Sequence, residues 1–394
     1  MLYLMIIYFL VGAKRTGIYY YTEKLAKELE RSGEEVKIVT GISKSIEVNI
    51  GGDETHMGWD RNSVFSVIKT LRLLDGAKDC LIHIQYSYKL FTKNPIKSHI
   101  LLLLALLYIG KIKGRKIIIT LHGVLVPNNF TNTKYLAIPL KLLLMSYYKL
   151  LYFLVYKIIL LTDIQKNILE KFYGLRADKM IIIPHGVDEC CALNPLHNSI
   201  QNYSFILLFH GFIRTTKGIK ELIDAHQIVI SQSYNVKLKI IGSIATETLE
   251  SVREKKYLNV ILDYITKSKL TPYIDLKIKD TFDDDEIMKE VLESDIVLLP
   301  YKDNYIETSG VLHKIMDCGK PVIVSNIPRF QGELVPDVDC LMVNPTADEI
   351  ANAIKRLIED KELYNRISKN LLEKAQERKW RRIAEMHMEL YKQM

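Results

Sequence analysis

The sequence predicts an α/β protein of two Rossmann-like, doubly wound domains that face a cleft, followed by a C-terminal helix. Its 394 residues suffice for two domains at roughly 150 residues each, and each domain is large enough to bury its own core. Short aliphatic runs alternate with longer helical segments in both halves, as in parallel sheets covered by helices on both faces. Tandem domains of this kind usually bind their ligand between the carboxyl ends of the two sheets.

In the first half, aliphatic runs indicate strands and the segments between them are helical in character. Residues 22–31 show the helical pattern, because Leu25, Ala26 and Leu29 fall on one stripe. The opening run from Met1 to Leu10 lacks the basic start and cleavage site of a signal peptide, and it reads as a buried strand. The predicted strands are 4–10, 35–40, 80–85, 116–121, 157–162 and 180–183.

The alternation restarts after residues 186–203, an irregular segment with little periodicity that we interpret as a linker. The predicted domains are therefore residues 1–190 and 191–375, with a final helix at 376–394. In the second domain, strands are predicted at 205–209, 236–241, 274–278, 296–299 and 321–324, and helices at 218–230, 284–292, 310–317 and 347–359.

The composition excludes disordered, collagenous and disulfide-scaffold proteins, because 48% of the residues are hydrophobic and only 19 are glycine and 11 proline. The net charge of +8 belongs to the first half, where residues 1–200 hold 26 Lys or Arg and 16 Asp or Glu. No acidic residue occurs between Asp79 and Asp163. Five cysteines without C-x-x-C spacing do not indicate a zinc site or a disulfide framework, and they favour a reducing, intracellular setting.

Two apolar segments of the first half resemble membrane spans. The run from Ile100 to Ile109 is too short to cross a bilayer before four basic residues follow. Residues 135–162 are richer in Leu, Tyr and Phe, but Lys141, Lys149 and Lys157 recur every eight residues. That spacing favours an amphipathic surface helix.

Two motifs in the first domain follow predicted strands. Residues 12–17 open a helix with Gly17 at its start, where a backbone can approach an anion closely. They do not form the G-x-G-x-x-G dinucleotide fingerprint, and a tight turn explains them equally well. His122 follows Thr120 and Leu121 at the carboxyl end of a strand, which favours a ligand-binding role over a structural one.

Two further motifs lie in the second domain. In residues 210–218, Arg214 and Lys217 follow a strand and precede a helix, and together they suit a diphosphate. In residues 307–311, Ser309 is a predicted N-cap, and the free backbone N–H groups of Gly310 and Val311 would accept phosphate oxygens. A solvated loop and an ordinary capped helix are the structural alternatives. The acidic triplet at 283–285 is interpreted as a helix start without a metal.

In this order, these segments resemble the retaining nucleotide-sugar glycosyltransferases with the GT-B fold, glycosyltransferase family 4. Thr16-Gly17 and the helix beginning Thr22-Glu23-Lys24 resemble the family's first loop and helix. The segment Ile183-Pro184-His185-Gly186-Val187-Asp188 is similar to its interdomain I-P-N-G-V-D. The family's donor-site segment is bracketed here by Asp295–Tyr301 and Gly319-Lys320-Pro321-Val322-Ile323, and Trp380 and Tyr391 lie on a final helix of the kind that crosses back onto the first domain.

The resemblance implies that domain 1–190 binds the acceptor and domain 191–375 the nucleotide-sugar donor. Arg214 and Lys217 would stabilise the diphosphate leaving group without a metal or other cofactor, aided by Ser309, Gly310 and Val311, and Gly17 would approach it. His122 would lie near the donor sugar and Glu307 would hold sugar hydroxyls, as the implied catalytic residues. The family's second Glu, which grips the ribose, falls on Lys314 or Ile315, so this chain departs from the pattern there.

The sequence therefore predicts a metal-independent transferase that moves a sugar to a lipid-linked or glycan acceptor. A GT-B nucleotide-sugar epimerase and a non-catalytic nucleotide-sugar-binding or scaffold relative are the alternatives. We expect a cytoplasmic protein that docks on anionic membrane through residues 89–157, since each well-placed cation contributes about 1 kcal/mol. Nucleic acid is not an expected partner, because the aromatic residues alternate with aliphatic runs and not with a basic groove pattern.

Overall fold

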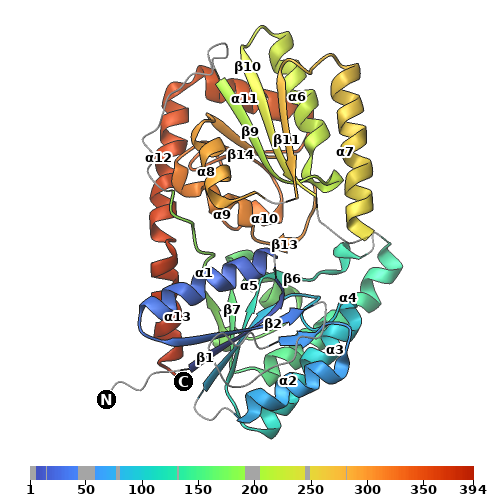
Figure 1. Cartoon of the computed structure of the whole chain (residues 1–394), viewed down its shortest axis with the longest axis vertical. Helices are drawn as coiled ribbons and strands as arrows, with labels where there is room; N and C mark the ends of the chain where they lie inside the picture. The colour runs from blue at the N-terminus through green and yellow to red at the C-terminus, as the bar shows by residue number, and fades with distance from the viewer. Residues whose placement is uncertain are drawn as a thin grey trace. The chain divides into compact units, whose positions relative to one another are not determined.

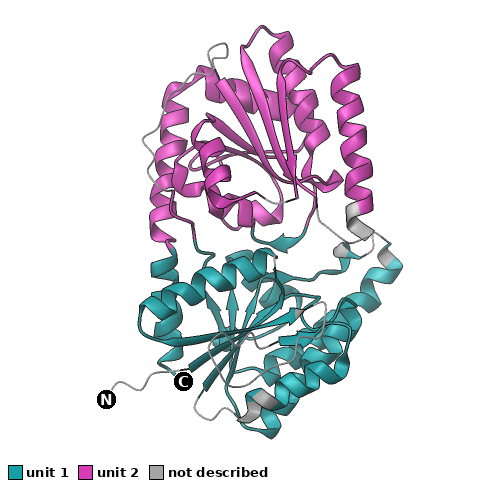
Figure 2. Ribbon diagram, viewed as in Figure 1, with its two compact units in different colours: residues 1–186, 305–308, 380–394 teal, residues 187–304, 309–379 magenta. Residues whose placement is uncertain are grey.

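The computed structural model describes residues 6–14, 16–42, 58–76, 80–130, 133–190, 205–244, 249–280 and 282–394. The chain forms two compact units (Figure 2). Unit 1 comprises residues 1–186, 305–308 and 380–394, and unit 2 comprises residues 187–304 and 309–379. These limits lie a few residues from the expected domain boundaries. Segment 305–308, which we expected in the second domain, belongs to unit 1.

Unit 1 is built on a parallel sheet whose strand order among the described residues is β3-β2-β1-β4-β5-β7-β8. The chain moves outward from β1 in both directions, which makes the sheet doubly wound (Figure 1). The predicted strands of this half are present, although residues 4 and 5 lie outside the described residues. The strands are β1 (Ile6–Ala13), β2 (Glu35–Ile42), β3 (Gly58–Asp60), β4 (Cys80–Tyr86), β5 (Ile117–Leu121), β7 (Lys157–Leu160) and β8 (Met180–Ile182).

Side chains alternate across this sheet and divide the core of unit 1 into two layers. In β1, Tyr8 and Leu10 pack into one cluster, and Ile7 and Phe9 pack into the other. The first cluster holds α3 (Pro95–Leu106) and α4 (Lys134–Leu154), and the second holds α1 (Gly17–Arg31) and α13 (Trp380–Tyr391). The remaining helical elements are α2 (Val64–Gly76), η1 (Leu107–Ile112), η2 (Pro127–Asn129), α5 (Asp163–Asn167), η3 (Ile168–Phe172) and η4 (Ala177–Lys179).

The C-terminal helix α13 returns to unit 1, as predicted. Its Trp380 ring lies against Gly186, where a Cβ atom would come within 2.3 Å of ring carbons. Glycine is therefore required at this position of the motif 183–188. Tyr391, near the other end of α13, is also buried in the α1 layer.

Unit 2 repeats the architecture with the strand order β11-β10-β9-β12-β14-β15 among the described residues. Each predicted strand is present, and β15 is an additional short edge strand that the pattern did not predict. The strands are β9 (Phe205–Phe212), β10 (Val236–Ser243), β11 (Ile274–Lys279), β12 (Ile296–Leu299), β14 (Val322–Ser325) and β15 (Leu341–Val343). Most of the predicted linker, residues 191–203, lies outside the described residues.

Helices cover both faces of this second sheet (Figure 1). Helices α8 and α11 coincide with the predicted ranges 284–292 and 347–359. The helical elements of unit 2 are η5 (Thr215–Lys217), α6 (Ile219–Ser231), α7 (Leu249–Lys267), α8 (Asp284–Leu292), α9 (Gly310–Ile315), η6 (Met316–Cys318), α10 (Pro328–Gln331), α11 (Ala347–Glu359) and α12 (Lys361–Glu377). Two doubly wound domains are thus confirmed.

Among the described residues, two helices of unit 1 are long and apolar enough to cross a membrane, judged by length and composition. They cover Pro95–Ile112 and Tyr135–Leu154. The expectation that the first apolar segment is too short was wrong, because α3 continues into η1 and the helix runs for 18 residues. Both segments also line the core of unit 1, since α3 buries Leu101, Leu102 and Leu106 and α4 buries Tyr148 and Leu151.

Candidate functional site

The strand order of unit 2 reverses between β9 and β12, and ligands of doubly wound sheets bind at the carboxyl ends of such a strand pair. The loop that follows β9 carries Arg214 and Lys217. The Arg214 guanidinium stacks over the Phe212 ring at 4.8 Å and forms an ion pair with Glu254, a buried residue of α7. The Lys217 Nζ lies 3.4 Å from the centroid of the Tyr301 ring, just beyond β12. Both predicted phosphate ligands therefore lie at this edge of the sheet.

The backbone of this loop is fixed by Gly218. Its φ of 66° lies in the left-handed region, and a Cβ atom there would come within 1.9 Å of the Pro300 carbonyl oxygen. Only glycine fits both conditions. The loop after β9 and the segment after β12 consequently pack against each other, which holds Lys217 over Tyr301.

The segment 309–311 forms the start of α9, as predicted. The Ser309 hydroxyl accepts a hydrogen bond from the Leu312 N–H at 3.3 Å, as an N-cap does. A Cβ atom on Gly310 would meet nothing within 4 Å, so the space before the helix is open. Burial raises the pKa of Tyr301 to about 12, while the positive charge of Arg329 and the nearby Ser309 side chain act in the opposite direction. Tyr301 thus lies beside Ser309 as well as beneath Lys217.

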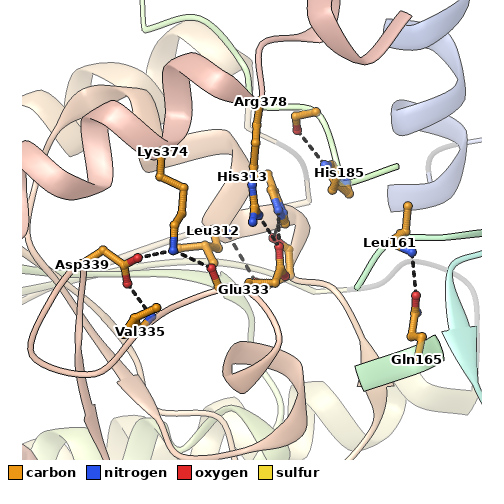
Figure 3. A network of polar contacts seen from close by, with 12 residues as sticks. Leu161, Gln165, His185, Leu312, His313, Glu333, Val335, Asp339, Lys374 and Arg378 are labelled. Atoms are coloured by element: carbon orange, nitrogen blue, oxygen red, sulfur yellow. Dashed lines mark hydrogen bonds and ion pairs between the residues drawn. The ribbon is translucent and has the colours of Figure 1, made fainter. Parts of the chain in front are cut away.

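A buried network of charged and polar side chains contacts α9 through His313 (Figure 3). His313 Nδ1 lies 2.8 Å from the Ser309 carbonyl oxygen, and its Nε2 lies 2.5 Å from Glu333 Oε2. Arg378 donates to the same carboxylate at 3.2 Å. Beside them, Lys374 donates to the Glu333 carbonyl oxygen at 2.9 Å and pairs with Asp339. These partners compensate the burial of Glu333 and fix the orientation of the helix that carries Ser309.

Lys314, which occupies one of the two positions on which the family's second Glu would fall, forms an ion pair with Asp284 at the start of α8. The Asp283 N–H donates to Glu286 Oε2 at 3.3 Å, so the acidic triplet begins a helix, as predicted. Burial lowers the pKa of His210 to about 4, and the charge of Lys314 acts in the same direction. His210 is therefore a neutral imidazole beside the ion pair of Lys314 and Asp284. The family's pattern would have a glutamate carboxylate in this part of the chain.

In unit 1, His122 follows β5 and belongs to a buried chain of hydrogen bonds. His122 Nε2 lies 2.7 Å from Gln85 Oε1, and the Gln85 amide nitrogen lies 3.5 Å from His83 Nε2. His83 Nε2 also lies 2.7 Å from Thr120 Oγ1, and His83 Nδ1 lies 2.6 Å from the Tyr391 hydroxyl. These residues come from β4, β5 and α13.

The donors and acceptors of this chain are consistent with one arrangement of protons. The Gln85 carbonyl accepts from His122 Nε2–H, and the Gln85 amide and the Thr120 hydroxyl donate to His83 Nε2. His83 Nδ1–H then donates to Tyr391. Burial lowers the pKa of His122 to about 3, with a smaller contribution from His387, so its imidazole is neutral and its Nδ1 is a hydrogen-bond acceptor.

Glu307 lies next to this histidine. It forms β13 (Ile306–Glu307), which pairs in antiparallel fashion with β6 (Gly123–Val124), and Glu307 is the partner of Gly123. A Cβ atom on Gly123 would lie 3.7 Å from Glu307 Oε2. The two predicted catalytic residues, His122 and Glu307, are therefore brought together within unit 1.

Gly17 is the first residue of α1, and Thr16 is its N-cap, with a hydroxyl that accepts from the Tyr19 N–H at 3.2 Å. A Cβ atom on Gly17 would meet nothing within 4 Å, as at Gly310. Arg15 of the same predicted loop lies outside the described residues.

Sequence reasoning missed four residues that hold these groups. Gln85 and His83 were visible as polar residues two positions apart in the buried run 80–86, and such a pattern places both on one face of a strand. Glu254 and Glu333 gave no local pattern, because each contacts its partner across a long sequence separation.

Comparison with known families agrees with this architecture. Residues 15–189 match the family described as Glycosyltransferase Family 4, and residues 197–374 match the family described as Glycosyl transferases group 1. The chain belongs to these glycosyltransferases. The recognition made from the sequence motifs is thus confirmed, and the protein is a transferase enzyme.

Solved structures of other glycosyltransferases share the fold. HepE of Anabaena, in complex with UDP and glucose, superposes with a TM-score of 0.72 at 17% identity over 100% of both chains. A glycosyltransferase from Rickettsia africae has a TM-score of 0.72 at 18% identity, over 99% of this chain and 98% of that one. At these identities the likeness establishes the GT-B fold.

A local sequence match points to a curated relative. The capsular polysaccharide biosynthesis glycosyltransferase CapM of Staphylococcus aureus is 41% identical over 66 residues. This match spans 17% of this glycosyltransferase and 17% of CapM.

Proposed function

We propose that this glycosyltransferase moves a sugar from a nucleoside diphosphate donor to a lipid-linked or glycan acceptor, with retention of configuration and without a metal. The observation that carries the proposal is the pair of cations, Arg214 and Lys217, at the carboxyl edge of the second sheet. The leaving group of such a reaction is a diphosphate whose negative charge grows in the transition state. Fixed cations and helix N–H groups stabilise that charge without reorganisation.

Because the His122 imidazole is neutral, its proposed role in the reaction is that of a hydrogen-bond acceptor. Because burial holds its pKa near 3, it does not supply a proton or a positive charge at neutral pH. Its Nδ1 instead accepts a hydrogen bond from a sugar hydroxyl, and Glu307, beside it, accepts from further hydroxyls. The sugar is thereby held by neutral and anionic acceptors, while the departing diphosphate is held by cations.

The relatives support a nucleotide-sugar donor and a glycan acceptor. HepE structures contain UDP, UDP with glucose, or UDP-glucose. WaaG, which is described as involved in lipopolysaccharide biosynthesis, has a TM-score of 0.62 and 14% identity over 98% of this chain and 99% of that one.

The phosphate site is tested by donor turnover in Arg214→Ala and Lys217→Ala. Each substitution should lower kcat by roughly 10² or more, as loss of a transition-state charge partner does. Arg214→Lys tests charge alone, since it keeps a cation beside the buried Glu254. Lys302→Ala is the matched control, because Lys302 pairs with Glu221 in the same unit and should leave turnover unchanged. Full activity in both alanine variants would show that the phosphate site is wrong.

Product analysis separates the alternatives. Anomeric analysis of the product tests retention, and turnover in EDTA tests metal independence. Conversion of the donor into a new free nucleotide sugar without acceptor would indicate an epimerase. A thermal-shift screen against UDP-, GDP- and ADP-sugars detects binding, because a ligand of the native state raises the Tm. No shift with any donor, and no affinity by calorimetry, would indicate a non-catalytic relative.

We also propose that the protein is cytoplasmic and docks on anionic membrane through the outer face of α3, η1 and α4. These helices are apolar on the face that points away from the core as well as on the buried one. Exposed large apolar patches of this kind mark binding or membrane surfaces. The exposed side chains include Ile96, Ile100, Leu104, Leu107 and Ile112 on α3 and η1, and Tyr135, Leu136, Ile138, Leu142, Leu143, Leu150 and Phe153 on α4.

Cations accompany this apolar face. The Lys111 Nζ lies 4.2 Å from the Phe153 ring centroid, and the Lys141 Nζ lies 4.2 Å from the Phe172 ring centroid. The sequence has no acidic residue from Cys80 to Thr162. Lysines that lie along apolar side chains, without carboxylates to neutralise them, complement an anionic lipid surface. Because the same helices bury their other face in unit 1, we favour docking over spanning.

Flotation with liposomes tests the docking. Wild type should float with anionic vesicles at low salt and be released by high salt, whereas a spanning protein would stay bound. Leu142→Glu with Leu143→Glu should reduce the bound fraction several-fold. Val252→Glu, at an exposed apolar residue of α7 in unit 2, is the matched control and should bind as wild type does. Wild-type protein that stays unbound at low salt would contradict the proposal.

A further inference from the structure

Two cysteines of unit 2 that are far apart in the sequence have their sulfur atoms in contact. The Cys318 Sγ lies 2.8 Å from the Cys190 Sγ, and it lies 3.5 Å from the Met288 Sδ. Both thiols are free and half-buried, so small molecules can reach them. The expectation of unpaired, reduced cysteines did not foresee this pair, because no spacing rule links positions 190 and 318.

Hydrogen bonds of the backbone place the segment that carries Cys190 beside the segment that carries Cys318. Where the chain enters unit 2, the Val187 N–H donates to the Arg378 carbonyl oxygen at 2.7 Å. The Asp188 N–H donates to the His313 carbonyl oxygen at 3.2 Å. The Cys190 N–H then donates to Asp317 Oδ2 at 2.7 Å. Segment 187–190 therefore runs along α9 and η6, and it ends opposite Cys318, the residue after Asp317.

Other side chains of unit 2 hold the Asp317 carboxylate in place. The short distance between the two thiols is therefore determined by the packing of unit 2. Lys379 pairs with its carboxylate, and the Gln376 side-chain amide donates to Asp317 Oδ1 at 2.7 Å. The carboxylate that positions Cys190 thus has three partners, all within unit 2. The geometry of the thiol pair depends on this carboxylate and not on a flexible contact between two side chains.

The two thiols differ in acidity. A hydrogen bond from Cys318 lowers the pKa of Cys190, against the effects of burial and of the negative charge of Asp317, with smaller lowering contributions from Lys379 and Lys320. The pKa of Cys318 is raised by the same interaction and by burial. Cys190 is therefore the better nucleophile, because the thiolate is the reactive form.

The other described cysteines have different surroundings. Cys340 is completely buried, and burial raises its pKa. Cys80 accepts a hydrogen bond from Arg115 at 3.1 Å. Among the described residues, Cys190 and Cys318 form a thiol pair. Cys191 lies outside the described residues.

We propose that Cys190 and Cys318 form a redox modification site, a dithiol that hydrogen peroxide or an organic hydroperoxide oxidises to an intramolecular disulfide. The Cys190 thiolate attacks a peroxide oxygen, the O–O bond breaks, and Cys190 becomes a sulfenic acid. Cys318 then attacks that sulfur, the S–O bond breaks, and water leaves. With hydrogen peroxide, two thiols and one peroxide give one disulfide and two waters, and the peroxide takes the two electrons.

The disulfide anchors the segment at which the chain enters unit 2 to the carboxyl end of the α9–η6 segment. It closes a loop from residue 190 to residue 318, and a cross-link across a loop of this length restricts the unfolded chain strongly. The disulfide is thus a reversible covalent cross-link to the segment α9–η6, whose first helix is capped by Ser309. A thiol or dithiol reductant restores the open form.

The experiment treats the full-length native protein with one equivalent of hydrogen peroxide, blocks the remaining thiols by alkylation, and maps disulfides by peptide mass spectrometry. The expected result is a dominant Cys190–Cys318 linked peptide that disappears on reduction. The Tm should rise by roughly 5 °C or more on oxidation and return on reduction. Both readouts are independent of donor turnover, so they do not depend on the proposed transferase reaction.

The matched variants decide the assignment. Cys190→Ser and Cys318→Ser should each abolish the linked peptide and the Tm shift, while Cys340→Ser and Cys191→Ser should keep both. Cys190→Ala and Cys318→Ala repeat the test without a hydroxyl. A linkage of Cys191 to either partner as the main product would overturn the proposal. So would accumulation of Cys190 sulfinic acid without disulfide.

Discussion

The two units share one architecture but differ in their surfaces. Unit 2 covers its sheet with helices whose carboxylates pair with strand lysines; Lys239 of β10, for example, is buried between Glu290 of α8 and Glu293, the residue that follows this helix. Unit 1 covers its sheet with α3 and α4, which expose leucine and isoleucine and come from an acid-free stretch. Among the described residues, unit 2 also exposes apolar side chains, such as Val252, Val260 and Leu262 of α7, but fewer than unit 1 does, so the fold does not require the apolar outer face of α3 and α4. The difference supports the proposed membrane face.

The buried polar groups of the two units also differ in charge. Unit 1 buries a neutral chain of hydrogen bonds from Tyr391 to His122, and unit 2 buries the charged group around Glu333. A neutral chain suits a site that holds hydroxyl groups. A rigid charged network suits a helix that must stay in place beside a charged ligand. The contrast indicates that each interior is matched to the part of the donor that we propose for its unit.

The largest expected effect is on the charged interior. Glu333→Ala should lower the free energy of unfolding by about 3–5 kcal/mol, because it leaves the buried His313 and the partly buried Arg378 without the carboxylate that both contact. Denaturant unfolding measures the change. Glu373→Ala is the control, since the exposed pair of Lys369 and Glu373 should contribute less than about 1 kcal/mol. A loss of under 1 kcal/mol for Glu333→Ala would remove the distinction between the two interiors.

The neutral interior is tested at Gln85. Gln85→Leu should lower kcat/KM for the donor by about 10–100-fold with little change in Tm, because His122 loses the acceptor that fixes its orientation. The pH dependence of activity in Gln85→Glu provides a second test. A protonated carboxyl group can still accept from His122 and donate to His83, so activity should recover as the pH falls. If Leu and Glu at position 85 behave alike at every pH, Gln85 does not position His122.

Most of the regular sheet could be predicted from the sequence, because buried parallel strands are near-continuous aliphatic runs. The strands that were missed, β3, β6, β13 and β15, are two or three residues long and carry no pattern of their own, and the long helices α7 and α12 of unit 2 were also not predicted. Pairing of β13 with β6 is what places Glu307 beside His122 in unit 1. That pairing joins residues 123 and 307, and a single sequence offers no local evidence for it.

The site residues divide in the same way. Arg214, Lys217 and Ser309 were predictable, since strand ends and helix starts can be located from sequence patterns. Their partners Glu254, Tyr301 and Glu333 depend on tertiary packing. The exchange of the family Glu for Lys314 was visible, but its consequence was not, because Asp284 meets it only in the folded chain.

Stability should fall with acid in both units, through their buried neutral histidines. Burial lowers the pKa to about 3 for His122 and to about 4 for His210, His226 and His387. The unfolded chain binds protons near pH 6.5 and the folded chain does not, so stability is present above pH 6.5 and is lost as the pH falls toward 4. Each histidine should cost about 1.4 kcal/mol per pH unit in that window.

Urea unfolding at pH 7, 6 and 5 measures how the free energy of unfolding changes with pH. His226→Gln should reduce this slope by the amount that corresponds to the uptake of about one proton on unfolding. His226 is a suitable choice because it is buried against the Val236 carbonyl in unit 2, away from the residues assigned to the donor. A slope that is unchanged in this variant would contradict the assignment of a lowered pKa to His226.

The smallest effect on stability, and the most direct comparison of the two units, concerns the glycines that begin α1 and α9. A methyl group at Gly17 or Gly310 would meet no protein atom within 4 Å, so Gly17→Ala and Gly310→Ala should change the free energy of unfolding by less than about 0.5 kcal/mol. If the donor diphosphate approaches both helix starts, each substitution should raise the donor KM several-fold, because the methyl group occupies the space of closest approach. Gly218→Ala is the contrasting control and should destabilise unit 2 by about 2 kcal/mol or more, since it clashes with Pro300. An unchanged KM in Gly17→Ala together with a raised KM in Gly310→Ala would confine phosphate binding to unit 2.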